Sequence, residues 1–145
     1  MTILMVESHY HANITDMLVD GATAALDKGG AEFERVSVPG ALEIPAAIAL
    51  AARAQRFDGF IALGTVIQSG TMHFEIIANE SAHGLMRLSA DHGLCIGNGI
   101  IAAVSEDEAQ RMADASMGDA GGDAARACLA LVAWRQRLGL MRAPQ

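Results

Sequence analysis

Two different hydrophobic patterns meet across the segment Gly64-Thr65-Val66-Ile67-Gln68-Ser69-Gly70-Thr71-Met72-His73-Phe74-Glu75. The apolar run at residues 60–63 ends where this segment begins. Residues with helical spacing follow from its end, at Phe74, Ile77, Ala78, Ser81, Leu85 and Leu88. This order predicts a strand, a short polar turn and then a helix. Open parallel sheets bind ligands at the ends of such strands, and helix N-termini attract anions, so we expect a binding site here.

Two side chains in this segment are candidates for chemistry. Thr71, together with the free backbone N–H groups near it, could hold an oxyanion at the start of the helix. His73 belongs to the same turn, and an imidazole can carry a proton near neutral pH. The alternative is a polar histidine at a helix start with no catalytic role, and the residues alone leave both interpretations open.

The rest of the chain alternates between apolar runs and segments with helical spacing. Strands are predicted at residues 3–6, 32–38, 60–65 and 94–101. Helices are predicted at residues 14–26, from 43 through at least 51, and at 74–91, 106–112 and 123–138. We expect Asn13 to cap the first of these helices and Gly29 and Gly30 to end it. Residues 113–122 are small and polar and predict a mobile segment, and residues 142–145 predict a tail.

The alternation of strands with helices indicates an α/β fold with three layers, in which helices cover both faces of a parallel sheet. No repeat or linker interrupts the pattern, so we expect a single domain over residues 1–145. Strands of a parallel sheet share one carboxyl edge. The segments expected to meet at that edge are residues 8–11, 38–42, 65–71 and 97–99, and the functional site is predicted there.

Composition excludes several classes of partner. The chain has 145 residues, a formal net charge of −7 and a single lysine, Lys28, which argues against general binding of nucleic acids or anionic membranes. No apolar run has transmembrane length, and the first residues lack the pattern of a secretion signal, so we expect a cytoplasmic protein. Cys95 and Cys128 do not have the spacing of metal ligands, which favours buried apolar thiols and no metal site.

Other candidates lie outside the central segment. Glu43 follows the break Pro39-Gly40, where it could bind a sugar hydroxyl or, more commonly, only stabilise a helix N-terminus. Tyr10 could stack on a flat heterocycle or pack on its own loop. The glycines beside Asn98 could bring backbone close to a ligand or a neighbouring subunit, or form a bulge. Trp134 is more typical of a core or an interface than of a binding site.

Several motifs together resemble the 6,7-dimethyl-8-ribityllumazine synthases, the penultimate enzymes of riboflavin synthesis. They are VPGALEIP at residues 38–45, GTVI at 64–67, GTMHFE at 70–75, NES at 79–81, IGNGI at 96–100, and the Gly-Gly-x-Ala-Ala opening of the last helix. The resemblance covers nearly the whole chain. It implies a flavodoxin-like, four-stranded parallel sheet. It also implies pentamers, or larger pentamer-based particles, with sites between neighbouring subunits.

The resemblance further implies a reaction and its residues. Family members join 5-amino-6-(ribitylamino)uracil to 3,4-dihydroxy-2-butanone 4-phosphate: an imine forms, phosphate leaves and the ring closes, with no metal or organic cofactor. His73 matches the proton-transfer residue, and Gly70 and Thr71 match the phosphate-binding turn. The residues that match the pyrimidine and ribityl site are Tyr10 for stacking, Ala41, Leu42 and Glu43 for the ribityl chain, and Thr65, Val66 and Ile67 for the uracil edge. Asn98 matches a position that the adjacent subunit presents to the site.

The chain departs from the family pattern where phosphate should bind. Family members have an arginine shortly before the last helix and a lysine where that helix opens, but residues 113–122 contain no basic residue and include Asp114 and Asp119. Arg111 is the nearest arginine, and Gln68 stands where members have another. The expected function is therefore lumazine synthase. The alternatives are a weak or inactive paralogue that binds a flavin, a lumazine or a related heterocycle, and a purely structural shell protein.

Overall fold

A computed structural model describes residues 1–140, so the predicted tail at residues 142–145 lies outside the described part. The strands of the described part are β1 (Thr2–Ser8), β2 (Glu32–Val38), β3 (Gly59–Ile67) and β4 (Ile96–Ala103). The helices there are α1 (Ala12–Lys28), α2 (Glu43–Ala52), α3 (Met72–His92), α4 (Glu106–Ala113) and α5 (Ala120–Arg137). The predicted alternation of strands and helices is confirmed.

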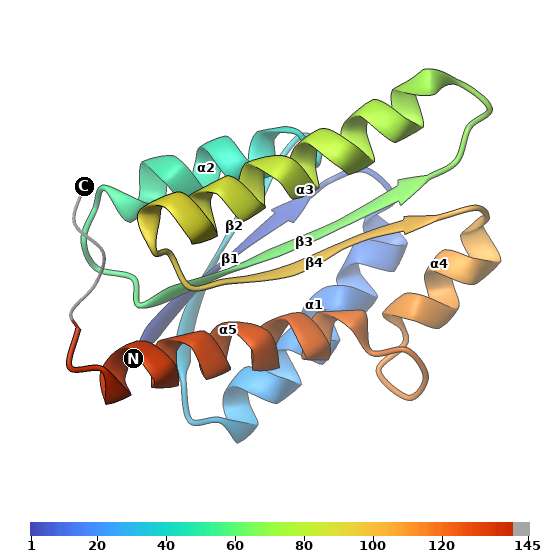
Figure 1. Ribbon diagram of the computed structural model, residues 1–145. Coiled ribbons are helices and arrows are strands. Elements are labelled where there is room, and N and C mark those ends of the chain that lie inside the picture. The colour runs from blue at the N-terminus through green and yellow to red at the C-terminus, as the bar shows by residue number, and fades with distance from the viewer. Residues whose placement is uncertain (141–145) are drawn as a thin grey trace.

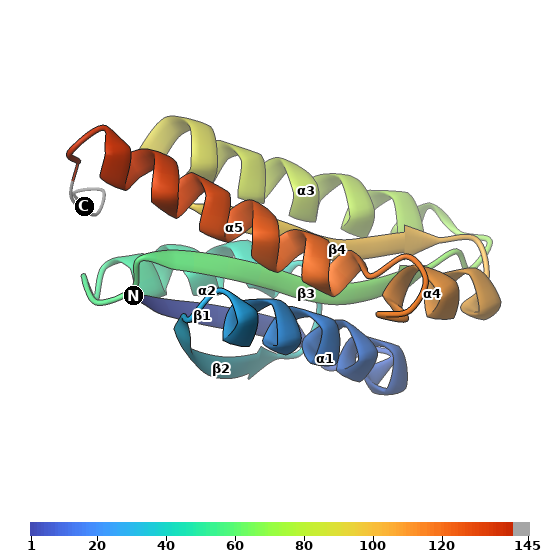
Figure 2. The same ribbon diagram turned by 90° about the horizontal axis from the view of Figure 1, so that it is seen from below.

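The strands form one parallel sheet in the order β2-β1-β3-β4. Figure 1 shows α2 and α3 on one face of this sheet and α1, α4 and α5 on the other, and Figure 2 shows the second face from below. This is the predicted three-layer arrangement with flavodoxin-like topology. The chain passes from β1 outward to β2 and then returns to β3, so the direction of winding reverses between β1 and β3.

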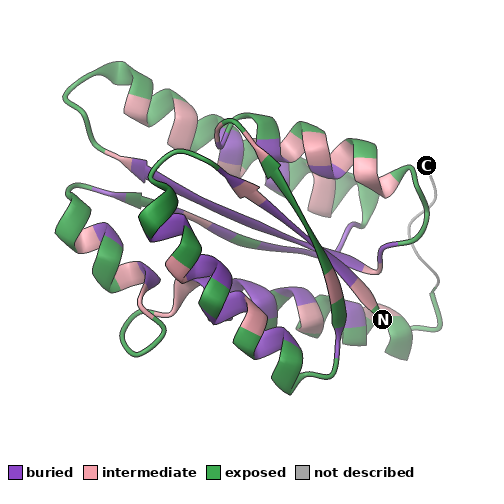
Figure 3. Ribbon diagram, turned by 180° about the vertical axis from the view of Figure 1, so that it is seen from behind, coloured by how far each residue is buried: buried purple, intermediate pink, exposed green. Residues whose placement is uncertain are grey.

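Two hydrophobic clusters hold the layers together, one on each face of the sheet. Ile3, Met5, Leu18, Ile61 and Val132 belong to the cluster under α1 and α5. Figure 3 shows that β3 is buried along most of its length, whereas β2 is largely exposed at the edge. Cys95 and Cys128 are buried and free, as predicted, and burial raises the pKa of both thiols. Trp134 is 52% exposed on α5, so it is not a core residue.

Three helix boundaries differ from the prediction. Helix α1 begins at Ala12, and its N-cap is His11 in the left-handed region (φ 54°), so the predicted Asn13 cap is wrong. Helix α3 begins at Met72 and therefore includes His73. Helix α5 begins at Ala120, three residues early, because the Asp119 carboxylate accepts a hydrogen bond from the Gly122 N–H and caps the helix.

The prediction that residues 97–99 leave the sheet is wrong. They lie inside β4, which continues without a bulge to Ala103, and Asn98 pairs with Ala62 in the middle of β3. The glycines serve helix packing instead. A Cβ atom on Gly97 would lie 1.8 Å from the carbonyl oxygen of Ala124, so only glycine lets α5 approach the strand this closely.

The connection between α4 and α5 is a hydrogen-bonded turn. The Asp114 carboxylate accepts hydrogen bonds from the Ser116 N–H at 2.8 Å and from the Ser116 hydroxyl at 2.7 Å. These bonds lower the pKa of Asp114. The Gly118 N–H donates to the Arg111 carbonyl at 3.0 Å, which closes the turn onto the end of α4.

Candidate active site

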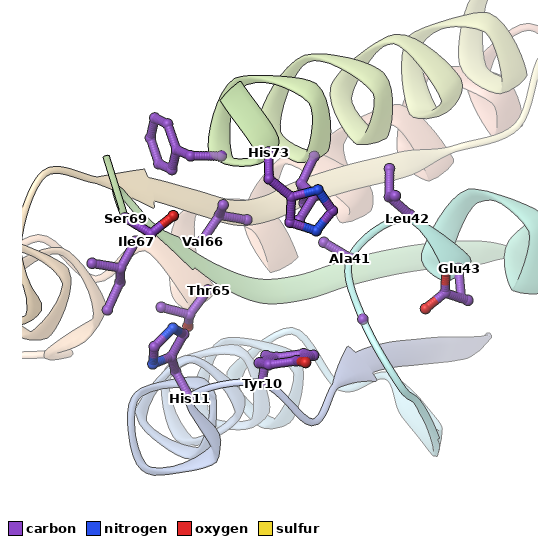
Figure 4. A pocket seen from close by; sticks show the side chains of 13 residues that line it. Tyr10, His11, Ala41, Leu42, Glu43, Thr65, Val66, Ile67, Ser69 and His73 are labelled. Carbon is purple, nitrogen blue, oxygen red and sulfur yellow. The ribbon is translucent and has the colours of Figure 1, made fainter. Parts of the chain in front are cut away.

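A cavity lies at the carboxyl edge of the sheet, where the winding reverses between β1 and β3. This is the place where open α/β sheets bind ligands. Its volume is about 380 Å³, within the range of small-molecule sites. Figure 4 shows the side chains that surround it. The lining residues are Tyr10, His11, Gly40, Ala41, Leu42, Glu43, Thr65, Val66, Ile67, Ser69, His73, Phe74 and Ile77.

The loop after β1 forms one wall. Tyr10 is 70% exposed, and its ring is tilted by 52° against the ring of His11. The His9 N–H donates to the Val38 carbonyl at 3.0 Å, which fastens the start of this loop to the end of β2. The Thr15 N–H donates to the His11 carbonyl, also at 3.0 Å. The backbone is therefore held at both ends, while the Tyr10 ring faces open space that a flat ligand could fill.

The turn after β2 forms a second wall. The Glu43 N–H donates to the Gly40 carbonyl at 3.2 Å, so the turn leads directly into α2. Ala41 is buried, whereas Leu42 and Glu43 are exposed toward the cavity that they line. The Glu43 carboxylate thus stands at the first residue of a helix, beside the positive end of the helix dipole.

The end of β3 lies between these walls. Thr65 and Val66 are buried, and Ile67 is half-buried at the last position of the strand. The Thr65 hydroxyl lies 3.0 Å from the hydroxyl of Thr15 on α1. The strand end is therefore tied to the helix that follows the Tyr10 loop.

The start of α3 closes the cavity opposite Tyr10. Gly70 has φ 79°, a conformation that glycine adopts without strain, and it turns the chain into the helix. Thr71 is the N-cap, but its hydroxyl makes no capping bond and lies 3.3 Å from the Ser69 hydroxyl. Figure 4 shows the His73 ring pointing from α3 into the space between the Tyr10 loop and Ala41.

Most of the predicted site residues line this one cavity. Gly70 and Thr71 are adjacent to it in sequence but do not line it, and Asn98 is exposed in the middle of the edge strand. His11 and Ser69 lie in segments that the sequence predicted at this edge but without a role, and the apolar pair Phe74 and Ile77 was not predicted to line the site. The pair belongs to the helical pattern that begins in the central segment, and this pattern alone could have placed one of its faces beside the strand end.

The cavity contains little positive charge. Its described lining includes the imidazoles of His11 and His73 and the Glu43 carboxylate, but no lysine or arginine. Arg111 is exposed on α4 and is not among the lining residues. Across residues 1–140 there is no group of three or more His, Cys, Asp or Glu side chains that could hold a metal ion. Within the same residues no helix combines the length and apolar character needed to cross a membrane.

Comparison with known proteins agrees with this geometry. The family model of 6,7-dimethyl-8-ribityllumazine synthase matches residues 1–136. The chain belongs to this family. A lumazine synthase of Sphingopyxis alaskensis is 50% identical over 138 residues, which are 95% of this chain and 97% of the relative. A lumazine synthase of Novosphingobium aromaticivorans is 52% identical over 92% of this chain and 96% of the relative. A lumazine synthase of Erythrobacter litoralis is 49% identical over 94% of this chain and 96% of the relative.

Lumazine synthase relatives thus match this chain over nearly the full length of both proteins. The match includes all the segments that surround the cavity, from the loop after β1 to the start of α3. The resemblance expected from the motifs is therefore confirmed, and nothing in the comparisons favours a binding-only paralogue.

Proposed function

We propose that this chain is an active 6,7-dimethyl-8-ribityllumazine synthase, a transferase of riboflavin biosynthesis. It joins 5-amino-6-(ribitylamino)uracil to 3,4-dihydroxy-2-butanone 4-phosphate. One observation carries the proposal: a chain of this family gathers Tyr10, Glu43, the end of β3 and His73 around one cavity of suitable size. The pyrimidine and the ribityl chain of the substrate can therefore bind next to each other, with a proton carrier beside them.

The pyrimidine binds between the Tyr10 loop and the end of β3. The exposed Tyr10 ring offers one face to the heterocycle, and stacking of this kind adds to the burial of apolar area. Backbone groups of residues 65–67 meet the polar edge of the uracil. The Glu43 carboxylate accepts hydrogen bonds from the ribityl hydroxyls, and such charge-assisted bonds are about twice as strong as neutral ones.

His73 moves protons during the condensation. The amino nitrogen of the uracil attacks the ketone carbon, and the carbonyl oxygen leaves as water with the two amine protons, so that a C=N bond replaces the C=O bond. An imidazole beside this carbon can deliver a proton to the departing oxygen and afterwards take one from carbon as phosphate leaves. Loss of phosphate leaves an enol at the former hydroxyl-bearing carbon, and this enol takes up a proton at its terminal carbon to become a methyl ketone. The ribityl-bearing nitrogen attacks this new carbonyl carbon, whose oxygen leaves as a second water, and the ring closes.

The phosphate group of the second substrate binds beside Gly70 and Thr71. The N-terminus of α3 offers unpaired N–H groups and the positive end of the helix dipole, and the Thr71 hydroxyl makes no capping bond that would compete. Because the described cavity lining holds no arginine or lysine, this half of the site depends on weaker contacts than a cationic clamp would supply.

We further propose a cytoplasmic pentamer, or a larger pentamer-based particle, built from single-domain chains. Asn98 is exposed on the edge strand and away from the cavity of its own chain, a position from which it could serve the site of a neighbour. Static light scattering at micromolar concentration tests this assembly. A monomer would contradict both the pentamer and a site shared between subunits.

Turnover with both substrates tests the activity. The purified protein is mixed with the ribitylaminouracil and the butanone phosphate, and formation of the fluorescent lumazine is compared with the rate without protein. Saturable acceleration supports the proposal. Binding of the pyrimidine without acceleration would overturn it in favour of a binding protein, and a flavin or lumazine that copurifies would then identify the ligand.

A further inference from the structure

One buried hydroxyl joins two walls of the cavity. Thr15 lies in the first turn of α1 and is 2% exposed, and Thr65 on β3 is 3% exposed. Their hydroxyl oxygens are 3.0 Å apart. The Thr15 hydroxyl also points to the Tyr10 carbonyl oxygen at 3.5 Å, a longer and weaker contact than the roughly 2.5–3.0 Å of an ordinary O–H···O hydrogen bond. Thr15 itself does not line the cavity.

The chemistry of the three oxygens fixes the direction of these contacts. A carbonyl oxygen only accepts, and a threonine hydroxyl has a single proton to donate. Both contacts are hydrogen bonds in only one assignment, in which Thr15 donates to Tyr10 and Thr65 donates to Thr15. Loss of the Thr15 hydroxyl would therefore leave the buried Thr65 hydroxyl unpaired, which is more costly than loss of an exposed bond, and would release the Tyr10 carbonyl as well.

The loop held by this bridge needs support. Tyr10 is 70% exposed, so packing does little to fix its ring. The next residue, His11, has φ 54° and ψ 52°, a left-handed conformation that costs a residue other than glycine about 1–2 kcal/mol. Strained residues of this kind persist where neighbouring contacts over-determine them, and they gather at ligand clamps.

We propose that Thr15 is a positioning residue for the pyrimidine half of the site. Its hydroxyl holds the backbone of Tyr10 against the end of β3, so that the ring and the strand edge stand ready on either side of a flat ligand. The inference rests on the proposed function. It assigns Thr15 no contact with substrate and no part in binding phosphate.

The test removes the hydroxyl with little change of shape. Thr15→Val is compared with Thr15→Ser, which keeps the hydroxyl, and with Thr23→Val, a matched control at a half-buried position of the same helix. We expect Thr15→Val to raise the KM for the ribitylaminouracil about 3- to 10-fold, as for one lost hydrogen bond. The KM for the butanone phosphate should stay the same, Thr15→Ser should recover most of the loss, and Thr23→Val should match the parent chain.

A second readout follows the loop directly. Tyr10 is the only tyrosine of the chain, so protein labelled with ¹³C-tyrosine gives one set of ring signals in NMR. Thr15→Val should shift or broaden this set before ligand is added, and Thr23→Val should not. Should Thr15→Val fail to fold, Thr65→Val leaves the contact between Thr15 and Tyr10 but removes its tie to the strand, and the ring signals are again expected to shift or broaden.

Failure of this inference can be told from failure of the proposed function. An inactive parent chain would overturn the function, while the ring signals would still report on the bridge. An active parent chain with an unchanged KM and unchanged ring signals in Thr15→Val would overturn the inference alone. An equal loss for both substrates would also overturn it, because that result indicates a general effect on stability.

Discussion

His73 and Glu43 line the same cavity from the first turns of two helices that cover the same face of the sheet. His73 is the second residue of α3, and Glu43 is the first residue of α2. A short helix turn restricts backbone motion, so both side chains start from fixed points. The backbones that carry the proposed proton carrier and the proposed ribityl-binding carboxylate are therefore both fixed, and substitutions can test each side chain independently.

Replacement of His73 should affect the chemical steps more than binding. His73→Ala is expected to lower kcat by about 10²–10⁴-fold, the usual range for a lost general acid–base group. The affinity for a pyrimidine analogue, measured by calorimetry, should change little because Tyr10 and the strand edge remain. His92→Ala is the matched control, since His92 is exposed at the far end of the same helix. Unchanged turnover in His73→Ala would remove this residue from the mechanism.

Replacement of Glu43 should weaken binding of the ribityl chain. Glu43→Gln keeps the shape but removes the charge, and a charge-assisted hydrogen bond contributes about 1.5–3 kcal/mol, so the KM for the ribitylaminouracil should rise by roughly 10- to 100-fold. A pyrimidine without the ribityl group should bind both proteins alike. Glu75→Gln, in the first turn of α3 but outside the cavity lining, serves as the control. An equal loss for both pyrimidines would show that Glu43 acts through the fold.

Inorganic phosphate should bind weakly and lose affinity as salt is added. Helix N–H groups and a hydroxyl contribute about 1 kcal/mol each, and the described lining adds no arginine or lysine. Calorimetry at two salt concentrations measures this. An arginine introduced in the segment that lacks basic residues, for example by Ala113→Arg, would not restore the charge, because Ala113 is fully buried. The informative variant is therefore Arg111→Gln, which removes the arginine nearest to this segment. Tight binding that Arg111→Gln abolishes would show that Arg111, from the same chain or from a neighbouring one, supplies the missing cation.

The strand–turn–helix pattern was sufficient to predict the architecture and most of the cavity. The hydrophobic run before Gly64 and the helical spacing after it depend only on local residues, and parallel strands necessarily share a carboxyl edge. The residues that follow the four strands were therefore predicted to lie at the same edge of the sheet. Three of those four segments do surround the cavity.

Two of the features that the sequence did not predict depend on contacts between elements distant in the sequence, and a third depends on an unusual local conformation. The glycines beside Asn98 resemble a strand break, but they allow α5 to approach β4, and nothing near them in the sequence shows this helix. The expected Asn13 cap failed because His11 adopts a left-handed conformation, which starts α1 earlier. The role of Thr15 could not be predicted either, because its partner Thr65 lies 50 residues away in the sequence.

The N-cap of α5 should contribute measurably to stability. Asp119 has φ 48°, accepts from the Gly122 N–H at 3.2 Å and contacts Arg126 at 2.9 Å. Asp119→Ala should lower the free energy of unfolding by about 0.5–2 kcal/mol, the usual cost of a lost cap. Asp119→Asn keeps the cap and loses only a surface ion pair, so its cost should be about 0–1 kcal/mol. Urea unfolding of both variants measures the difference, and equal losses would assign the effect to the ion pair.

The Cys128 thiol should make stability fall at alkaline pH. Burial raises its pKa from 9.0 to about 12, so the unfolded chain loses this proton at lower pH than the folded chain does. The contribution is fully present below pH 9 and is lost as pH rises toward 12, by at most about 1.4 kcal/mol per pH unit. Urea unfolding should show the stability advantage over Cys128→Ala shrinking between pH 8 and pH 10. A constant advantage would mean that the thiol does not titrate differently in the two states.

The glycine contacts of α5 also limit how the enzyme can move. A Cβ atom on Gly121 would lie 2.0 Å from the Leu18 carbonyl oxygen, and one on Gly97 would lie 1.8 Å from that of Ala124. Main chain therefore rests on main chain where α5 meets α1 and β4, with no side chain between them that could change rotamer. Because the main chains of these elements are in such close contact, we expect α5, α1 and β4 to move together as one unit. No described residue that lines the cavity belongs to α5, so we expect any adjustment to substrate in the loop after β1, the turn before α2 and the start of α3.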